Sequence, residues 1–411
     1  MKEGIKDMSK TELLEIIRNG ENSRVEFKRD DVQPADMAKE IVAFLNFHGG
    51  NIFLGIDDDG TICGTTRQNL EEWVMSICRD KVKPEIIPDY EMFEVEGRFV
   101  AVATFTQGLY VHHLWHNQHR YYYIRVGSTN REASQEELQR LFQQRGQIRF
   151  DLKPVPGAIF EALDMPRIKN YFRDIRKQDI PSDEDRETWQ QLLVNTEIMV
   201  ADQDRHIPSV GGILLFGKNP NHYLPQAGIS AVAYRGKEKD YEAIEREMIR
   251  GPIVAKIIDK DIVNRGLVER AVDFIRRNTG SKSYLMEGGR RIDKPDYPEE
   301  VIREMIVNAI AHRDYTISGT DIELSIYGDR LEVISPGKLP NTITIERMKA
   351  GCRATRNELI KEVLRDYHYV EATGLGVPRK IIAGMLKHND TAPDLIEDEY
   401  SFTVRLWREK P

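Results

Sequence analysis

The spacing of hydrophobic residues divides the first third of the chain into strands and helices. In residues 24–28, Val25 and Phe27 alternate with polar side chains, which predicts a half-buried strand. After Pro34, apolar residues recur at helical spacing until Gly49. Similar patterns predict strands at 51–57, 91–105 and 120–128 and helices at 11–18, 67–80 and 134–146. Together they predict an α+β domain around a mixed or mostly antiparallel sheet.

The middle of the chain has a less regular pattern. The Pro-containing stretch 150–157 marks a boundary, and helices are expected after it. Residues 206–220 are apolar and bounded by Gly and Pro, as in a strand, whereas 250–278 have helical spacing interrupted near Gly266. This helical region is compatible either with a winged-helix-like unit or with connecting scaffold.

The last part of the chain predicts an α/β sandwich. Pro298 begins a clear helix, which strand patterns at 321–329 and 330–337 follow. Two further helices, 357–367 and 380–389, precede a final strand at 400–407. The expected domains are therefore 1–149, 150–289 and 290–411.

Composition is that of a water-soluble globular protein without a general affinity for polyanions. The chain has 411 residues, of which 40% are hydrophobic and 31% charged, and its formal net charge is −8. Any nucleic-acid site must therefore be a local basic patch. Three scattered cysteines and the absence of a long apolar run predict a cytoplasmic protein with neither disulfides nor membrane spans.

The first candidate site combines acidic residues and a lysine near two adjacent strands. Alternation places Glu26 and Lys28 on one face of the first strand, and Asp57 ends the second. If the strands pair, these side chains can converge, with Glu21 at the mouth of the strand. Carboxylates bind hard divalent cations, which activate water for phosphodiester cleavage, while a lysine stabilises developing negative charge. Solvated acidic residues at strand ends are the alternative interpretation.

The motifs ENSRVEFKRDD, FLNFHGG, GIDDDG and YYYIRVGS resemble those of the Schlafen AlbA-type domain, also called divergent AAA-4, over about residues 12–145. In nuclease-active relatives, two glutamates and an aspartate of these motifs bind metal and cleave transfer or ribosomal RNA. The resemblance assigns these roles to Glu21, Glu26 and Asp57. Other bacterial relatives are known only as transcriptional regulators or ATP-binding proteins.

Basic and aromatic residues nearby could bind RNA. Candidate phosphate contacts are Lys28, Arg29, Arg120, Arg125 and Arg131. Residues 121–123 are tyrosines that either stack on bases or fill the core. His112, His113, His116 and His119 either bind a transition metal or form a polar hairpin tip.

The second candidate site lies on the helix after Pro298. Its apolar stripe is Val301, Ile302, Met305, Ile306 and Ile310. Glu304, Asn308 and His312 recur every four residues and therefore share one side. An asparagine within an apolar helix needs a polar partner, which a ligand would supply.

Together, ExxxNAxxHRDY, ISPGKLP, RNELI and GLGVPRKI resemble the GHKL ATPase family, in the branch once labelled helicase C-terminal-like, over about residues 290–408. The resemblance implies that Asn308 holds Mg²⁺ against ATP and that Glu304 is a general base. It makes Gly374 and Gly376 lid glycines and Arg356 a phosphate contact. In the turn that usually reads adenine, Ser335 replaces the aspartate and Gly337 follows.

Three hypotheses follow. The first is a nucleotide-controlled ribonuclease dependent on Mg²⁺ or Mn²⁺, acting in defence or stress. The second is an ATP-binding regulator of DNA or of a protein partner without catalysis. The third is a scaffold whose homo-oligomeric assembly ATP controls.

Overall fold

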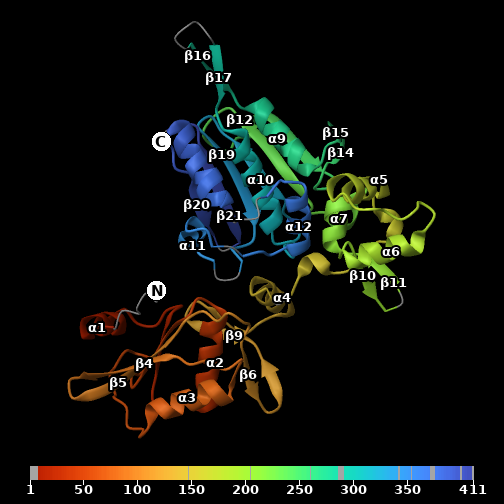
Figure 1. Cartoon of the computed structure of the whole chain (residues 1–411). Coiled ribbons are helices and arrows are strands. Elements are labelled where there is room, and N and C mark those ends of the chain that lie inside the picture. Colours follow the sequence, from red (N-terminus) through yellow and green to blue (C-terminus); the bar gives the residue numbers. More distant parts are fainter. Residues whose placement is uncertain are drawn as a thin grey trace. The chain divides into compact units, whose positions relative to one another are not determined.

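The computed structural model describes residues 8–146, 148–203, 205–259, 261–285, 291–340, 343–352, 354–370, 375–398 and 400–409. The chain divides into two units, Met1–Gln147 and Ile148–Pro411 (Figure 1). The first boundary lies close to the expected one. The expected boundary between residues 289 and 290 falls inside the second unit, because one sheet takes strands from both sides of it.

A mixed four-stranded sheet is the centre of the first unit, in the order β1-β2-β5-β4. β1 is parallel to β2, and the other neighbours are antiparallel. The expected α+β class is therefore confirmed. The sheet and its helices are β1 Val25–Lys28, β2 Gly50–Leu54, β4 Asp89–Val95, β5 Arg98–Phe105, α1 Lys10–Asn19, α2 Pro34–Asn46, α3 Leu70–Asp80 and α4 Gln135–Gln144.

Each face of this sheet has its own hydrophobic core. On one face, Phe27 meets Phe53 edge to face, with ring centroids 5.8 Å apart, and both belong to a cluster that includes Leu13 of α1. On the other, Ile52 and Leu54 pack in a cluster with residues of α2 and α3. Because Glu26 and Lys28 are in register with Ile52 and Leu54, they lie on the α2 side.

Two smaller sheets complete the first unit. One has the order β3-β6-β7 and the other pairs β8 with β9. α2 packs closely against β8, which brings residues 123–126 next to the main sheet. The strands are β3 Val82–Lys83, β6 His113–His116, β7 His119–Tyr121, β8 Tyr123–Val126 and β9 Thr129–Glu132.

The second unit is organised by a six-stranded sheet in the order β13-β12-β18-β19-β21-β20. β12 is parallel to β18, and the other pairs are antiparallel. α9 and α10 lie side by side along the sheet (Figure 1). These elements are β12 Gly228–Tyr234, β13 Ala243–Arg250, β18 Ile322–Ile326, β19 Arg330–Pro336, β20 Asp394–Glu397, β21 Ser401–Trp407, α9 Leu267–Asn278 and α10 Glu299–His312.

The remaining elements of the second unit connect and cover this sheet. Before β12 come η1 Phe150–Leu152, η2 Phe160–Ala162, α5 Met165–Asn170, η3 Tyr171–Ile175, α6 Arg186–Asn195, β10 Met199–Asp202, β11 Arg205–Pro208, α7 Val210–Phe216 and α8 Pro220–Tyr223. After β13 come β14 Lys256–Ile258, β15 Asp261–Asn264, β16 Ser281–Leu285, β17 Arg291–Pro295, α11 Ile345–Lys349, α12 Glu358–Asp366, η4 Gly376–Ile382 and α13 Ala383–Asn389. Residues 165–216 contain helices and one β-hairpin. The winged-helix interpretation of this region stays a prediction.

Two local predictions in the middle region are wrong. The strand expected within 206–220 is largely helix α7, all of whose residues are buried, so it has no polar face to reveal helical periodicity. The helix expected over 250–278 begins only at Leu267. The preceding β-branched residues, including Ile257 and Ile262, instead form the β14–β15 hairpin.

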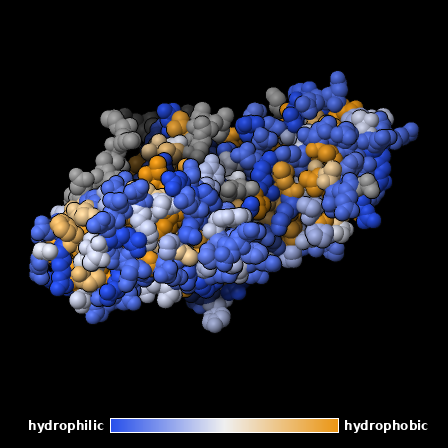
Figure 2. Space-filling view, turned by 90° about the horizontal axis from the view of Figure 1, so that it is seen from below, coloured by the Kyte–Doolittle hydropathy of each residue, from blue (hydrophilic) through white to orange (hydrophobic). Residues whose placement is uncertain are grey.

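On the face of the molecule seen in Figure 2, hydrophilic residues predominate, and hydrophobic ones occur in small groups between them. Over the described part of the chain, no helix combines the length and apolar character needed to cross a bilayer.

Candidate functional site

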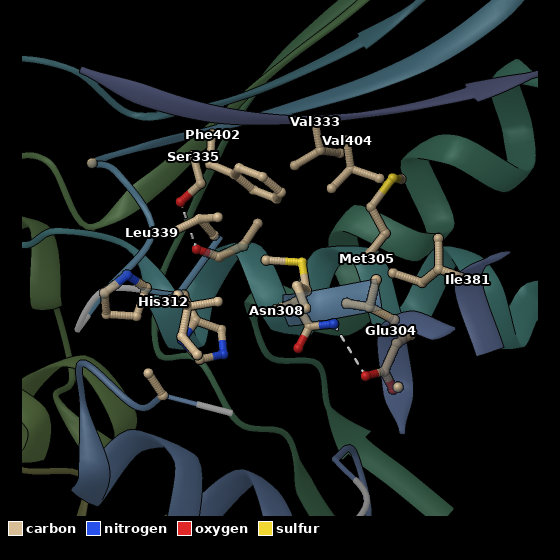
Figure 3. Close-up of a pocket in the computed structure, with 18 of the residues that line it drawn as sticks. Glu304, Met305, Asn308, His312, Val333, Ser335, Leu339, Ile381, Phe402 and Val404 are labelled. Atoms are coloured by element: carbon tan, nitrogen blue, oxygen red, sulfur yellow. Dashed lines mark hydrogen bonds between the residues drawn. The ribbon is translucent and has the colours of Figure 1, made fainter. Parts of the chain in front are cut away.

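A pocket in the second unit lies between α10 and the six-stranded sheet (Figure 3). Its cavity measures about 130 Å³. Apolar side chains from both elements line one part, and polar residues of α10 line another. The lining includes Glu304, Met305, Asn308, His312, Val333, Ser335, Gly337, Lys338, Lys361, Gly376, Phe402 and Val404.

The polar row predicted on α10 borders this pocket. Asn308 Nδ2 donates to Glu304 Oε1 at 3.1 Å, which fixes the amide orientation (Figure 3). Glu304 is 3% exposed, and its Oε2 lies 3.5 Å from Lys380 Nζ. Burial lowers the pKa of His312 to about 4, so this ring is neutral at pH 7. The row therefore presents a carboxylate, an amide and a neutral imidazole.

Two predicted glycines occupy positions where a side chain would collide with the site. A Cβ at Gly376 would lie 1.8 Å from Glu304 Oε1, so the η4 backbone rests against this carboxylate. Gly337 has φ +107°, and its Cβ would lie 2.4 Å from a guanidinium nitrogen of Arg356. Gly374, the other predicted lid glycine, lies outside the described residues.

Arg356 does not have the position expected of a phosphate contact. It is 3% exposed, and its Nη1 and Nη2 donate to the carbonyls of His312 and Lys338 at 3.0 and 2.6 Å. Burial lowers the pKa of this guanidinium. Arg356 therefore joins the end of α10 to the loop after β19. Lys338 and Lys361, which sequence analysis missed, line the pocket instead.

Ser335 lies near the end of β19, where the family resemblance leads us to expect an adenine-reading carboxylate. Its Oγ donates to the Ala309 carbonyl at 2.8 Å (Figure 3). Among the described lining residues, Glu304 is the only carboxylate, and it lies at the end of the polar row away from His312.

The pocket fits a nucleotide with a divalent cation. Met305, Val333, Phe402 and Val404 provide an apolar surface for a planar base. With Nδ2 directed at Glu304, the Asn308 amide oxygen faces away from it, and oxygen is the ligand atom that Mg²⁺ prefers. Such a cation would neutralise phosphate charge and polarise the phosphate oxygens.

The first unit places Glu26 in a compact ionic network with Lys28 and Arg125. Glu26 is 5% exposed, and its carboxylate accepts from Lys28 Nζ at 2.5 Å and from Arg125 Nη2 at 2.6 Å. Arg125 Nη1 also donates to Glu40 at 3.1 Å. Glu40, on the inner side of α2, was missed because sequence alone could not show that α2 covers β1.

Charges in this network alter the protonation of its members. Burial alone would lower the pKa of Lys28, but Glu26, Glu40 and Glu21 outweigh it and raise the pKa. Burial raises the pKa of Glu40, and the Glu26 charge adds to the effect. Burial likewise raises the pKa of Glu21, whose Oε1 accepts from the Phe27 amide at 2.8 Å.

The predicted metal triad is not assembled in this structure. Asp57 lies in the turn after β2, where its Oδ1 is 3.4 Å from Arg29 Nη1. Across the described ranges, no group of three or more Asp, Glu, His or Cys residues could hold a metal ion. Glu21, Glu26 and Asp57 therefore remain metal ligands only as a prediction.

The predicted basic residues differ in their accessibility. The Arg125 side chain is fully buried and is not available to a phosphate, contrary to expectation. Arg29 and Arg131 are exposed but paired with Asp57 and Glu137. Arg120 is exposed on β7. His116 and His119 flank the turn of the β6–β7 hairpin, as in the polar-tip interpretation. His112 instead is buried, with its Nδ1 2.8 Å from the Pro84 carbonyl. Metal binding by these histidines stays a prediction.

Two family models match separate regions of the chain. Residues 21–134 match "Schlafen, AlbA_2", and residues 319–406 match "Putative ATP-dependent DNA helicase recG C-terminal", a HATPase-type model. The chain thus combines a Schlafen AlbA-type region with an ATPase-type region, as its motifs suggested. This combination indicates a nucleotide-linked function related to nucleic acids. Glu304, Asn308 and His312 precede the second matched region.

Two of the solved structures that match differ widely in how much of the chain they cover. The DIP2311 protein from Corynebacterium diphtheriae is 21% identical over 95% of this chain and 76% of its own, with a TM-score of 0.44. The N-terminal domain of a RecG-related protein from Nitrosomonas europaea is 24% identical over 24% of this chain and 74% of its own, with a TM-score of 0.21. No curated protein sequence matches the chain.

Proposed function

We propose that the second unit binds ATP with Mg²⁺ and that nucleotide occupancy regulates nucleic-acid binding by the first unit. The observation that carries this proposal is the polar row of α10 beside an apolar pocket. The cavity of about 130 Å³ is smaller than the roughly 300–1,000 Å³ of pockets that enclose drug-sized ligands. The cavity therefore suits the base alone, and the phosphates extend beyond it.

Lysines around the pocket support binding of the phosphates. Lys338 and Lys361 line it, and Lys380 lies beside Glu304. Lysines of this kind are well suited to phosphate as mobile point charges. Because Ser335 replaces a carboxylate, base selection rests on its hydroxyl and on backbone groups. We therefore expect weak discrimination between ATP and GTP.

The test is nucleotide-dependent thermal stabilisation of the full chain. A ligand that binds the folded state at 100 times its Kd stabilises it by about 2.7 kcal/mol. Asn308→Ala should abolish the shift with ATP and Mg²⁺, whereas Asn308→Asp, which keeps an oxygen ligand, should retain part of it. Arg131→Ala, a surface change in the other unit, is the matched control. An unchanged ATP shift in Asn308→Ala would exclude this role.

Metal-dependent RNA cleavage is a second candidate function. The favouring observation is geometric: within the Schlafen-matched region, Glu26 contacts Lys28 and Arg125, and Glu40 contacts the same guanidinium. For cleavage, Glu26 would have to release Lys28 and Arg125 and bind a cation. The released side chains could then contact RNA phosphates. We expect structured RNA to be cut only with Mg²⁺ or Mn²⁺, and not by Glu26→Gln.

Cleavage assays with and without ATP separate the candidate functions. Cutting by the parent but not by Glu26→Gln supports a ribonuclease. If RNA and DNA bind but remain intact under every metal and nucleotide condition, the binding regulator is the correct function. Sedimentation with and without ATP tests the homo-oligomeric scaffold, for which ATP must change the mass of the particle.

A further inference from the structure

The three-stranded sheet of the first unit has one buried face and one face that carries basic and aromatic side chains. Val82, Leu114 and Tyr121 are in register across β3, β6 and β7 and pack against the core of α2 and α3. Alternation therefore turns the intervening residues outward. We call Lys83, His113, Trp115, Arg120 and Tyr122 the hairpin face.

Contacts within the hairpin face place its cations and aromatic rings together. Trp115 is directly opposite Arg120, and Lys83 is opposite His113. Both cations act on His113, whose pKa is lowered by burial and further by Arg120 and Lys83. Its ring centroid lies 5.3 Å from that of Tyr122. The two rings are tilted by 47°, and Tyr122 also packs against Phe142 of α4. One short surface thus offers positive charge beside aromatic rings.

The hairpin that carries Trp115 has a tight two-residue turn. Asn117 and Gln118 have φ of 48° and 64°, the left-handed conformations that a tight hairpin turn of this type requires. Trp115 is one residue before the pair that flanks this turn, and it is 41% exposed. A large aromatic ring is therefore presented to solvent on a fixed support, with little conformational entropy to lose on binding.

Charge on these strands favours an anionic partner. β3, β6 and β7 contain no acidic residue, although the whole chain has a net charge of −8. Lys83 Nζ donates to the Arg79 carbonyl at 2.6 Å, at the end of α3, which fixes its position. Arg120 is exposed. A phosphate chain that crosses the hairpin face would meet both cations.

We propose that the hairpin face binds single-stranded nucleic acid, with a base stacked on Trp115 and backbone phosphates at Arg120 and Lys83. This inference rests on the proposed nucleic-acid function of the first unit. An exposed indole selects single strands, because bases in a duplex already stack on one another and cannot reach it. Stacking accepts any base, so little sequence preference is expected.

The experiment measures fluorescence anisotropy of the full chain with labelled 12-nucleotide oligo(U), oligo(dT) and a duplex of the same length. Trp115→Ala should weaken single-strand binding about tenfold or more, and Trp115→Phe should largely preserve it. Arg120→Gln should reduce the slope of log K against log salt by about 0.7. Phe99→Ala, which removes another exposed aromatic residue of this unit, is the matched control.

Equal single-strand affinity in Trp115→Ala and Phe99→Ala would overturn the inference. So would a parent that binds the duplex as tightly as the single strands, although the nucleic-acid function would then stand. If the parent binds neither single strands nor the duplex, both the nucleic-acid function and the hairpin-face proposal fail. The thermal shift tests ATP binding independently of this result. Oligo(U) and oligo(dT) compared with each other distinguish RNA from DNA as the preferred strand.

Discussion

Replacing Arg125 by alanine should destabilise the first unit strongly, although sequence alone suggested a surface contact. The side chain is fully buried and reaches from β8 to β1 and α2. Its Nη2 donates to the Glu26 carboxylate and to the Asn22 carbonyl at 2.6 and 2.9 Å, and Nη1 donates to Glu40 at 3.1 Å. Its guanidinium also lies 4.7 Å from the centroid of Phe44.

The expected magnitude follows from what truncation leaves behind. Removing one member of a buried ionic network typically costs about 3–5 kcal/mol, because the remaining charges stay buried without their partner. Glu26 would keep only Lys28, and Glu40 would lose its guanidinium. For a unit that ends at Gln147, this loss corresponds to a decrease in Tm of about 10–20 °C.

Calorimetry of the full chain checks this value in the transition of the first unit. Arg131→Ala is the control, because Arg131 pairs with Glu137 at the surface and should change Tm far less. A double-mutant cycle of Arg125→Met with Glu26→Leu should give a favourable coupling energy. If Arg125→Ala lowers Tm no more than Arg131→Ala does, the network does not hold β1 and β8 together. The earlier assignment of Arg125 as a phosphate contact would then be preferred.

Burial lowers the pKa of His112 to about 4 from about 6.5, so the unfolded state binds more protons between these values. Stability is therefore full above pH 6.5 and falls by about 3 kcal/mol toward pH 4, and urea titrations should show a flatter profile for His112→Gln. Gly376→Ala places a methyl group against Glu304 and should weaken ATP binding in calorimetric titrations, with a loss of about 1–3 kcal/mol in stability. Arg356→Ala removes two hydrogen bonds to backbone carbonyls and should lower the Tm of the second unit. Equilibrium dialysis at a temperature where the variant is folded should show an unchanged nucleotide affinity.

Sequence periodicity was sufficient to predict the part of the candidate nucleotide pocket that a single helix, α10, positions. Glu304, Asn308 and His312 are four residues apart, and regular helix geometry alone brings them to one side. The apolar stripe of α10 was also buried as predicted. Lys380 was missed because its approach to Glu304 depends on η4, which is distant in sequence.

The acidic site was harder to predict because strand alternation ends before Asp57. β2 stops at Leu54, and Gly55 takes φ +95°. The amides of Gly55 and Ile56 both donate to the Lys28 carbonyl, which interrupts the regular ladder. The alternation that placed Asp57 beside Glu26 therefore does not apply there. Arg125 is buried because β8 packs on α2. This packing joins segments that are distant in sequence, so the local hydrophobic pattern does not predict it.

The parallel pairing of β12 with β18 also has a consequence for synthesis of the chain. Ile229 pairs with Ile322, about 90 residues later. β18 begins 72 residues after β13 ends. At the usual translation rates of about 5–20 residues per second, the β12–β13 hairpin therefore emerges roughly 4–14 s before its neighbour. During this interval, one edge of β12 and the apolar residues Ala231 and Ile249 lack their final cover. The nascent chain is therefore most prone to aggregate, and most dependent on chaperones, before β18 leaves the ribosome.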